Sequence, residues 1–332
     1  MFKKLFLGFI FIFLFLYLIM SNSKDKPIIL RYAHMNPTTS VAGQQAKLFS
    51  DIVNQKTKGK VKVEVYPDSQ LGSIKDMLGM ITRGQIAIHH TTMAGLGDLY
   101  EDFAVFDTPY LFKDVNHLLK AADTNSELIK KFNEELKRKS RVKVFYTFYF
   151  GTRQLTCSKL VKTPDDLKGL KIRAIPFPIY TAAVEGLGAI PTPLDFSETY
   201  KALSVGIVAG QENPLDTIYS ARLYEVQKYL ILTGHIMGME AVIFNDDVWN
   251  KLPKNIQNIL NEAAVEAGKK ATEMTLESER ELLGKLKSLN MTIIGENEGL
   301  AVDKFKVRTN ALIKEKYGAK YNKYYNIINN IK

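Results

Sequence analysis

The chain has 332 residues, of which 46% are hydrophobic and 24% are charged, a balance typical of a globular protein with enough material for two domains. The formal net charge of +10 comes from lysines spread along the chain. No basic run is interleaved with aromatic residues, which argues against a nucleic-acid-binding protein. The one cysteine, Cys157, excludes an internal disulfide, and we interpret it as a buried structural thiol because no base is recognisably spaced to activate it.

The first segment, residues 1–22, has the layout of an export signal peptide. Lys3 and Lys4 give a positive start, an apolar run follows from Leu5 to Met20, and polar residues follow that run. The apolar run is slightly short for a membrane span. We therefore expect an exported protein. Retention as an N-terminal membrane anchor stays open, because no small-x-small cleavage site stands out.

Short apolar runs alternate with amphipathic stretches in the next part of the chain. Apolar residues at every second position predict strands, and apolar residues at every third or fourth position predict helices. The predicted elements are strands at 28–33, 61–66 and 85–89, and helices at 40–57 and 73–83. This β-α-β-α-β order is typical of a mostly parallel sheet covered by helices.

A second set of elements begins near residue 142. Its members are strands at 142–150, 170–175, 207–209, 229–232 and 241–244, and helices at 178–187 and 196–205. We expect the last two strands to return to the first set. One long helix is predicted at 254–289, which at 1.5 Å per residue spans roughly 50 Å and so extends across both sets. One or two helices are expected at 305–331.

This order of elements predicts two α/β lobes that are joined by crossing strands, with a long helix as a strut. We expect residues 27–148 and 236–250 to form lobe I and residues 149–235 to form lobe II. The long helix and the C-terminal helices, at 251–332, would pack on both. A cleft between hinged lobes suits ligand binding, because closure of the lobes excludes water.

Signatures of enzymes are missing from the sequence. It contains no nucleophile elbow, phosphate loop, dinucleotide fingerprint or zinc-protease motif. His89 and His90 are neighbours on a predicted strand, so their side chains point to opposite faces and cannot easily share a metal ion. The sequence therefore predicts a protein that is not an enzyme and needs no metal or cofactor.

Two arginines stand in apolar surroundings. Arg153 follows the predicted strand at 142–150, and Arg173 lies inside the predicted strand at 170–175. A buried guanidinium keeps its charge and needs an anionic partner, which could be a ligand carboxylate or an acidic residue of the other lobe. Asn213, which Pro214 holds in an extended conformation, could donate to the same carboxylate or could belong to a plain turn.

Six short motifs occur in order along the chain. They are Tyr-Pro-Asp-Ser-Gln-Leu-Gly at 66–72, Gly-Leu-Lys-Ile-Arg at 169–173, Glu-Thr-Tyr-Lys-Ala-Leu at 198–203, Gly-Gln-Glu-Asn-Pro at 210–214, Tyr-Glu-Val-Gln-Lys-Tyr at 224–229 and Thr-Gly-His at 233–235. Together they resemble the solute-binding subunits of tripartite ATP-independent periplasmic (TRAP) transporters of the DctP type. The resemblance covers essentially the whole chain after the predicted export signal.

This resemblance implies a periplasmic-binding-protein-like fold and a function without chemical steps. A member of this family captures a small organic acid in the periplasm and delivers it to TRAP membrane permease subunits, driven by an ion gradient. The alternative is an extracytoplasmic ligand-sensing subunit of a signalling system. We expect a monomer, with a dimer through the long helix left open, and the sequence does not identify the acid.

The resemblance also implies roles for individual residues. Arg173 would form a paired salt bridge with the ligand carboxylate, supported by Arg153 and Asn213. The other ligand-binding residues that we expect are Phe196, His90, Thr91 and His235. Sialic-acid-binding members carry Glu and Arg in the segment that corresponds to residues 91–95, where this chain has Thr-Thr-Met-Ala-Gly, so sialic acid is disfavoured.

Overall fold

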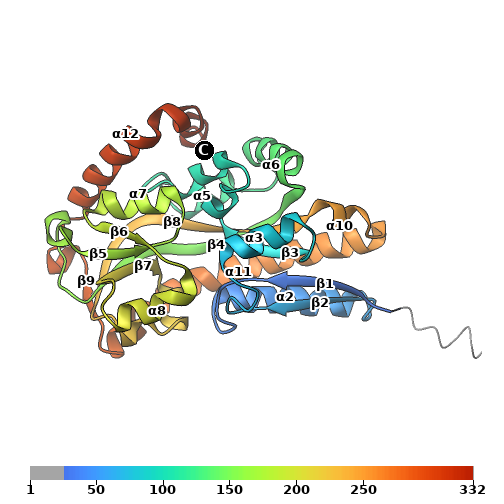
Figure 1. Cartoon of the computed structure of the whole chain (residues 1–332), viewed down its shortest axis with the longest axis horizontal. Helices are drawn as coiled ribbons and strands as arrows, with labels where there is room; N and C mark the ends of the chain where they lie inside the picture. Colours follow the sequence, from blue (N-terminus) through green and yellow to red (C-terminus); the bar gives the residue numbers. More distant parts are fainter. Residues whose placement is uncertain (1–25, 332) are drawn as a thin grey trace, which may run out of the picture.

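The computed structural model describes residues 26–331 of the chain, and the predicted export signal at 1–22 lies outside that range. Its strands form a single sheet in the order β2-β1-β3-β8-β4-β7-β5-β6, with β9 paired to β8 (Figure 1). The strands are β1 (Ile28–Ala33), β2 (Val61–Tyr66), β3 (Ile88–Thr92), β4 (Val142–Cys157), β5 (Lys171–Ala174), β6 (Ile190–Pro193), β7 (Gly210–Pro214), β8 (Tyr229–Asn245) and β9 (Thr292–Ile294).

The sheet consists of two parallel groups that two long antiparallel strands connect. Strands β1, β2 and β3 are parallel to one another, and so are β5, β6 and β7. Between the groups, β8 is antiparallel to β3 and β4, and β4 is antiparallel to β7. This arrangement confirms the predicted α/β fold with crossing strands, while the predicted lobe boundaries stay a prediction.

The crossing strands are longer than the sequence predicts. The strand predicted at 142–150 continues to Cys157, and the strands predicted at 229–232 and 241–244 are one strand, β8. In the middle, Gly151 pairs with Gly238 next to a shift in register. Gly151 has a φ of 115°, which glycine adopts without strain, so the backbone can turn there and continue as a strand.

Two predicted strands have different bounds in the structure. The strand expected at 85–89 lies at Ile88–Thr92. The strand expected at 207–209 is wrong, because the amide of Ile207 donates to the carbonyl of Ala202 (2.9 Å) and so completes the end of a helix. The strand β7 begins instead at Gly210, where a Cβ atom would lie 2.1 Å from a backbone oxygen of β4.

Several helices begin at a residue whose side chain caps the first turn. Ser40 accepts a hydrogen bond from the amide of Gly43 at the start of α2 (3.0 Å), and Ser73 and Asp76 form a reciprocal capping box at α3. The helices are α2 (Val41–Lys56), α3 (Ile74–Thr82), α4 (Met93–Leu96), α5 (Val115–Ala121), α6 (Glu127–Ser140), α7 (Pro178–Leu187), α8 (Phe196–Ser204), α9 (Leu215–Ser220), α10 (Asp246–Asn250), α11 (Lys254–Ser288) and α12 (Val302–Asn329).

The two longest helices connect distant parts of the sheet. The 35 residues of α11 span about 52 Å and pack on α2, β4 and α9, as the predicted strut requires (Figure 1). The tail is a single helix, α12, which packs on α7 and places the ring of Tyr324 4.9 Å from that of Phe132 in α6. Within residues 26–331, none of the helices has the length and apolar character of a membrane span.

Candidate functional site

A cavity is lined by residues from both parallel groups of strands and from the crossing strands. Phe196, at the start of α8, lines the cavity as the sequence predicted. The polar residues in the lining are Asn36, Thr92, Arg153, Arg173, Asn213, Thr217 and Glu240.

Arg153 has an ion-pair partner within the protein. Its Nε lies 2.5 Å from Oε2 of Glu212, and its Nη2 donates to Oε1 (2.9 Å) and to the backbone oxygen of the same residue (2.6 Å). The sequence left open an acidic partner in the other lobe; the partner instead lies in β7, the neighbour of β4. Burial favours the neutral forms, but the mutual attraction raises the pKa of Arg153 and lowers that of Glu212 to about 2.

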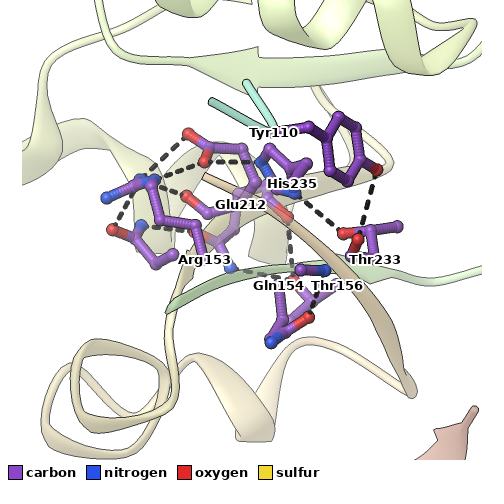
Figure 2. Close-up of polar contacts among 10 residues, drawn as sticks. Tyr110, Arg153, Gln154, Thr156, Glu212, Thr233 and His235 are labelled. Carbon is purple, nitrogen blue, oxygen red and sulfur yellow. Dashed lines mark hydrogen bonds and ion pairs between the residues drawn. The ribbon is translucent and has the colours of Figure 1, made fainter. Parts of the chain in front are cut away.

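Glu212 also contacts His235, which lies behind the cavity lining. Nε2 of His235 is 3.1 Å from Oε2 of Glu212, and its Nδ1 is 2.8 Å from the hydroxyl of Thr233 (Figure 2). The Tyr110 hydroxyl donates to the carbonyl of Thr233 (3.2 Å), which adds a further contact to this network. Glu212 thus contacts both His235 and Arg153, which links the two residues. His235 itself is not among the residues that line the cavity.

Arg173 differs from Arg153 because it has no carboxylate partner among the described residues. It is 1% exposed, its Nε donates to the carbonyl of Leu194 (2.9 Å), and its Nη1 has no hydrogen-bond partner. Burial lowers its pKa to about 10, so it is still a cation at neutral pH. Its guanidinium carbon lies 6.0 Å from the centre of the Phe196 ring. A buried, charged fork with an unpaired nitrogen is a site for an anion.

Asn213 is held in a fixed orientation beside Arg153. Its Oδ1 accepts from Nη2 of Arg153 (2.9 Å), and its Nδ2 donates to Oε1 of Gln211 (2.5 Å). The Gln211 amide donates in turn to the hydroxyl of Thr156 (3.1 Å). The alternating side chains of β7 and β4 thus position the asparagine amide in the cavity wall.

His90 and Thr91, in β3, are buried but do not line the cavity. The nitrogens of His90 contact the hydroxyl of Tyr32 (2.9 Å) and Oδ1 of Asn36 (2.9 Å), so His90 supports Asn36, which does line it. Burial lowers the pKa of His90 well below its ordinary value, which keeps the ring neutral. The hydroxyl of Thr91 has no hydrogen-bond partner. The following residue, Thr92, takes the place in the lining that we expected for Thr91.

Residues 26–331 offer no site for a metal ion built from three or more His, Cys, Asp or Glu side chains. Cys157 is buried at the end of β4, and burial raises the pKa of its thiol. A thiol with a raised pKa is a poor nucleophile at neutral pH. This agrees with the structural role that the sequence suggested for Cys157.

The sequence reasoning missed several residues of the site. Glu212 stands in the same motif as Asn213 but received no role, because only the pairing of β7 with β4 brings it to Arg153. Glu240 was missed although a signal existed, since it is the one carboxylate in the apolar segment 236–244. The remaining missed polar residues of the lining are Asn36 and Thr217.

A family model matches most of the chain. The model for "Bacterial extracellular solute-binding protein, family 7" (DctP) matches residues 32–318. The C4-dicarboxylate-binding periplasmic protein DctP of Rhodobacter capsulatus is 32% identical over 268 residues, which is 80% of each chain. The sialic acid-binding periplasmic protein SiaP of Vibrio cholerae is 32% identical over 254 residues, 76% of this chain and 78% of the relative.

A solved structure shows the same fold. The crystal structure of a TRAP periplasmic solute-binding protein from Roseobacter denitrificans with bound L-galactonate superposes with a TM-score of 0.85. Its sequence is 26% identical, and the match covers 91% of this chain and 99% of that one.

Proposed function

The chain belongs to bacterial extracellular solute-binding protein family 7, and from this membership we propose that it holds the carboxylate of a small organic acid between Arg173 and Asn213 and delivers the acid to a TRAP membrane permease. Proteins of this family are solute-binding transport proteins and not enzymes. The family is periplasmic, in agreement with the export signal that the sequence predicts.

The observation that carries the proposal is the unpaired guanidinium of Arg173. A fully buried cation costs several kcal/mol unless an anion and hydrogen bonds compensate for the lost hydration. Nη1 of Arg173 lacks a partner, and the residue lines the cavity together with Asn213. A ligand carboxylate would satisfy the guanidinium with two parallel hydrogen bonds.

Arg153 supports this contact indirectly. Glu212 already neutralises its charge, so Arg153 adds little net attraction for an anion. Its hydrogen bond to Oδ1 instead fixes the amide of Asn213, whose Nδ2 group carries two N–H donors and uses one of them for Gln211. The second donor is available to the same carboxylate that binds Arg173.

Capture and release would follow from movement about the crossing strands. The cavity lining comes from both sides of β4 and β8, so rotation about these strands opens and closes it. In the closed form the buried site excludes water, which strengthens the ion pair with the ligand. Docking on the permease would favour the open form, where the exposed carboxylate is rehydrated and leaves.

Thermal unfolding tests the proposal directly. Residues 24–332 are purified and screened against a panel of organic acids, because a ligand that binds only the folded state raises the melting temperature. We expect Arg173→Ala to abolish the stabilisation and Arg173→Lys to reduce it strongly, since lysine cannot form the two parallel bonds. Arg138→Ala, at an exposed arginine of α6, is the control and retains it. Unchanged ligand affinity in Arg173→Ala would refute the proposal.

A further inference from the structure

Three buried polar atoms without hydrogen-bond partners belong to residues that line the same cavity. They are Nη1 of Arg173, Oγ1 of Thr217 and Oε2 of Glu240. Buried polar groups in folded proteins are nearly always paired, so unpaired atoms gathered around one cavity indicate what a ligand must supply. One of the three is a cation, and the other two are a hydroxyl and a carboxyl.

The charges around the cavity leave room for one ligand carboxylate. Arg153 is paired with Glu212, so Arg173 is the cation without a carboxylate partner among the cavity residues that the structure describes. One carboxylate on the ligand neutralises Arg173. A second carboxylate would be buried without a cation of its own, and an unpaired buried charge is strongly unfavourable.

Glu240 is an acidic residue in the lining of the cavity that Arg173 also lines. It lies in β8 between Met239 and Ala241, is 1% exposed, and forms no ion pair within residues 26–331. Burial and the nearby carboxyl of Asp107 raise the pKa of Glu240 well above its ordinary value, and the charge of Arg153 does not compensate. The raised pKa favours the protonated carboxyl, which offers one O–H donor and acceptor oxygens.

We propose that the ligand is a hydroxylated monocarboxylate, and that the carboxyl of Glu240 forms a hydrogen bond with one of its hydroxyl groups. The unpaired hydroxyl of Thr217 offers a second contact of the same kind. This inference rests on the proposed function, because it takes Arg173 as the carboxylate anchor.

Four-carbon acids with different substituents provide the first test. D-erythronate carries hydroxyl groups on its second, third and fourth carbons, whereas succinate carries a second carboxylate and 4-aminobutyrate carries an ammonium group at the far end. L-galactonate and D-glucuronate extend the hydroxylated set to six carbons. Isothermal titration calorimetry with residues 24–332 should show that at least one hydroxylated acid binds about tenfold or more tightly than succinate and 4-aminobutyrate.

Variants of Glu240 provide the second test. Glu240→Gln keeps a donor and an acceptor, so we expect it to weaken the binding of the hydroxylated acid only about threefold. Glu240→Leu removes both groups and should weaken that binding at least about tenfold, while a cooperative thermal transition shows that the variant is folded. A loss in Glu240→Gln as large as in Glu240→Leu would contradict a hydrogen bond that a neutral amide can replace.

The outcomes separate the inference from the proposed function. If succinate or 4-aminobutyrate binds as tightly as every hydroxylated acid, the inference is wrong, but carboxylate capture by Arg173 stands. If no carboxylate binds at all, the inference and the proposed function are both wrong. Tight binding of a hydroxylated acid that Glu240→Leu does not weaken overturns the role of Glu240 alone.

Discussion

Glu212→Gln is expected to destabilise the protein strongly. Glutamine has nearly the same size, so the change removes the charge of residue 212 and little volume. Arg153 stays protonated and buried at 1% exposure, with no other carboxylate in an ion pair with it among residues 26–331. Removing one member of a buried ion pair costs about 3–5 kcal/mol. At roughly 2 °C per kcal/mol, the melting temperature should fall by about 6–10 °C.

The dependence on pH gives this prediction a second readout. Although burial favours the neutral form, the charge of Arg153 and the contacts of His235 lower the pKa of Glu212 to about 2. The ionised carboxylate therefore stabilises the fold above the unfolded pKa of about 4.3, and this contribution is lost as the pH falls through about 2. The difference in melting temperature between wild type and Glu212→Gln should shrink over that window in calorimetry.

Glu225→Gln is the matched control for Glu212→Gln. Glu225 also pairs with an arginine, Arg222, but at the surface, where such pairs contribute little. Its melting temperature should stay within about 1 °C of the wild type. The double variant Arg153→Met/Glu212→Leu should recover much of the loss, because it leaves no unpaired charge. A melting temperature of Glu212→Gln close to that of Glu225→Gln would refute the reasoning.

Three further changes have defined outcomes. Glu240→Gln should stabilise the ligand-free protein, relative to the wild type, increasingly as the pH rises above about 4.3. Above that pH the unfolded wild type loses the proton of Glu240 more readily than the folded protein, whose Glu240 pKa is raised, so the wild type loses stability and the variant does not. Melting curves from pH 4 to 8 check this. Gly210→Ala should lower the melting temperature sharply, because its Cβ would lie 2.1 Å from a backbone oxygen. Gly284→Ala is the control and should raise the melting temperature slightly, because it has open space around it in α11 and alanine favours a helix over glycine. The carboxylate of Asp216 accepts a hydrogen bond from the amide of Val41 (3.0 Å) and so joins α9 to α2. If this contact stabilises the closed form, Asp216→Ala should weaken ligand binding several-fold in titration calorimetry.

Much of the fold could be predicted from periodicity. The elements Ile28–Ala33, Val61–Tyr66 and Pro178–Leu187 lie where the sequence predicts them, because one face of each is apolar at a regular spacing. The apolar run at 207–209 was misread, because the amides of Ile207 and Val208 bond to the carbonyl of Ala202 and close the end of a helix, and the strand begins only at Gly210. The continuity of β8 was also missed, since Gly234 and Gly238 look like breaks in a strand.

The site was predicted in part. Arg173, Arg153, Asn213 and Phe196 line the cavity, and the family resemblance carried that prediction further than their apolar surroundings did. The pairing of Arg153 with Glu212 depends on two strands whose partner residues are 59 positions apart, and no local pattern encodes it. For that reason the sequence could not show that Arg153 is neutralised while Arg173 has no carboxylate partner among the described residues.

The position of β8 constrains the order in which the chain can fold. This strand begins only at Tyr229, yet it fills the gap between β3 and β4 in the middle of the sheet. An N-terminal fragment that ends before β8 would expose two unpaired strand edges and so would be prone to aggregation. Pairings between such distant segments also slow folding. The complete sheet therefore cannot form until most of the polypeptide has been synthesised.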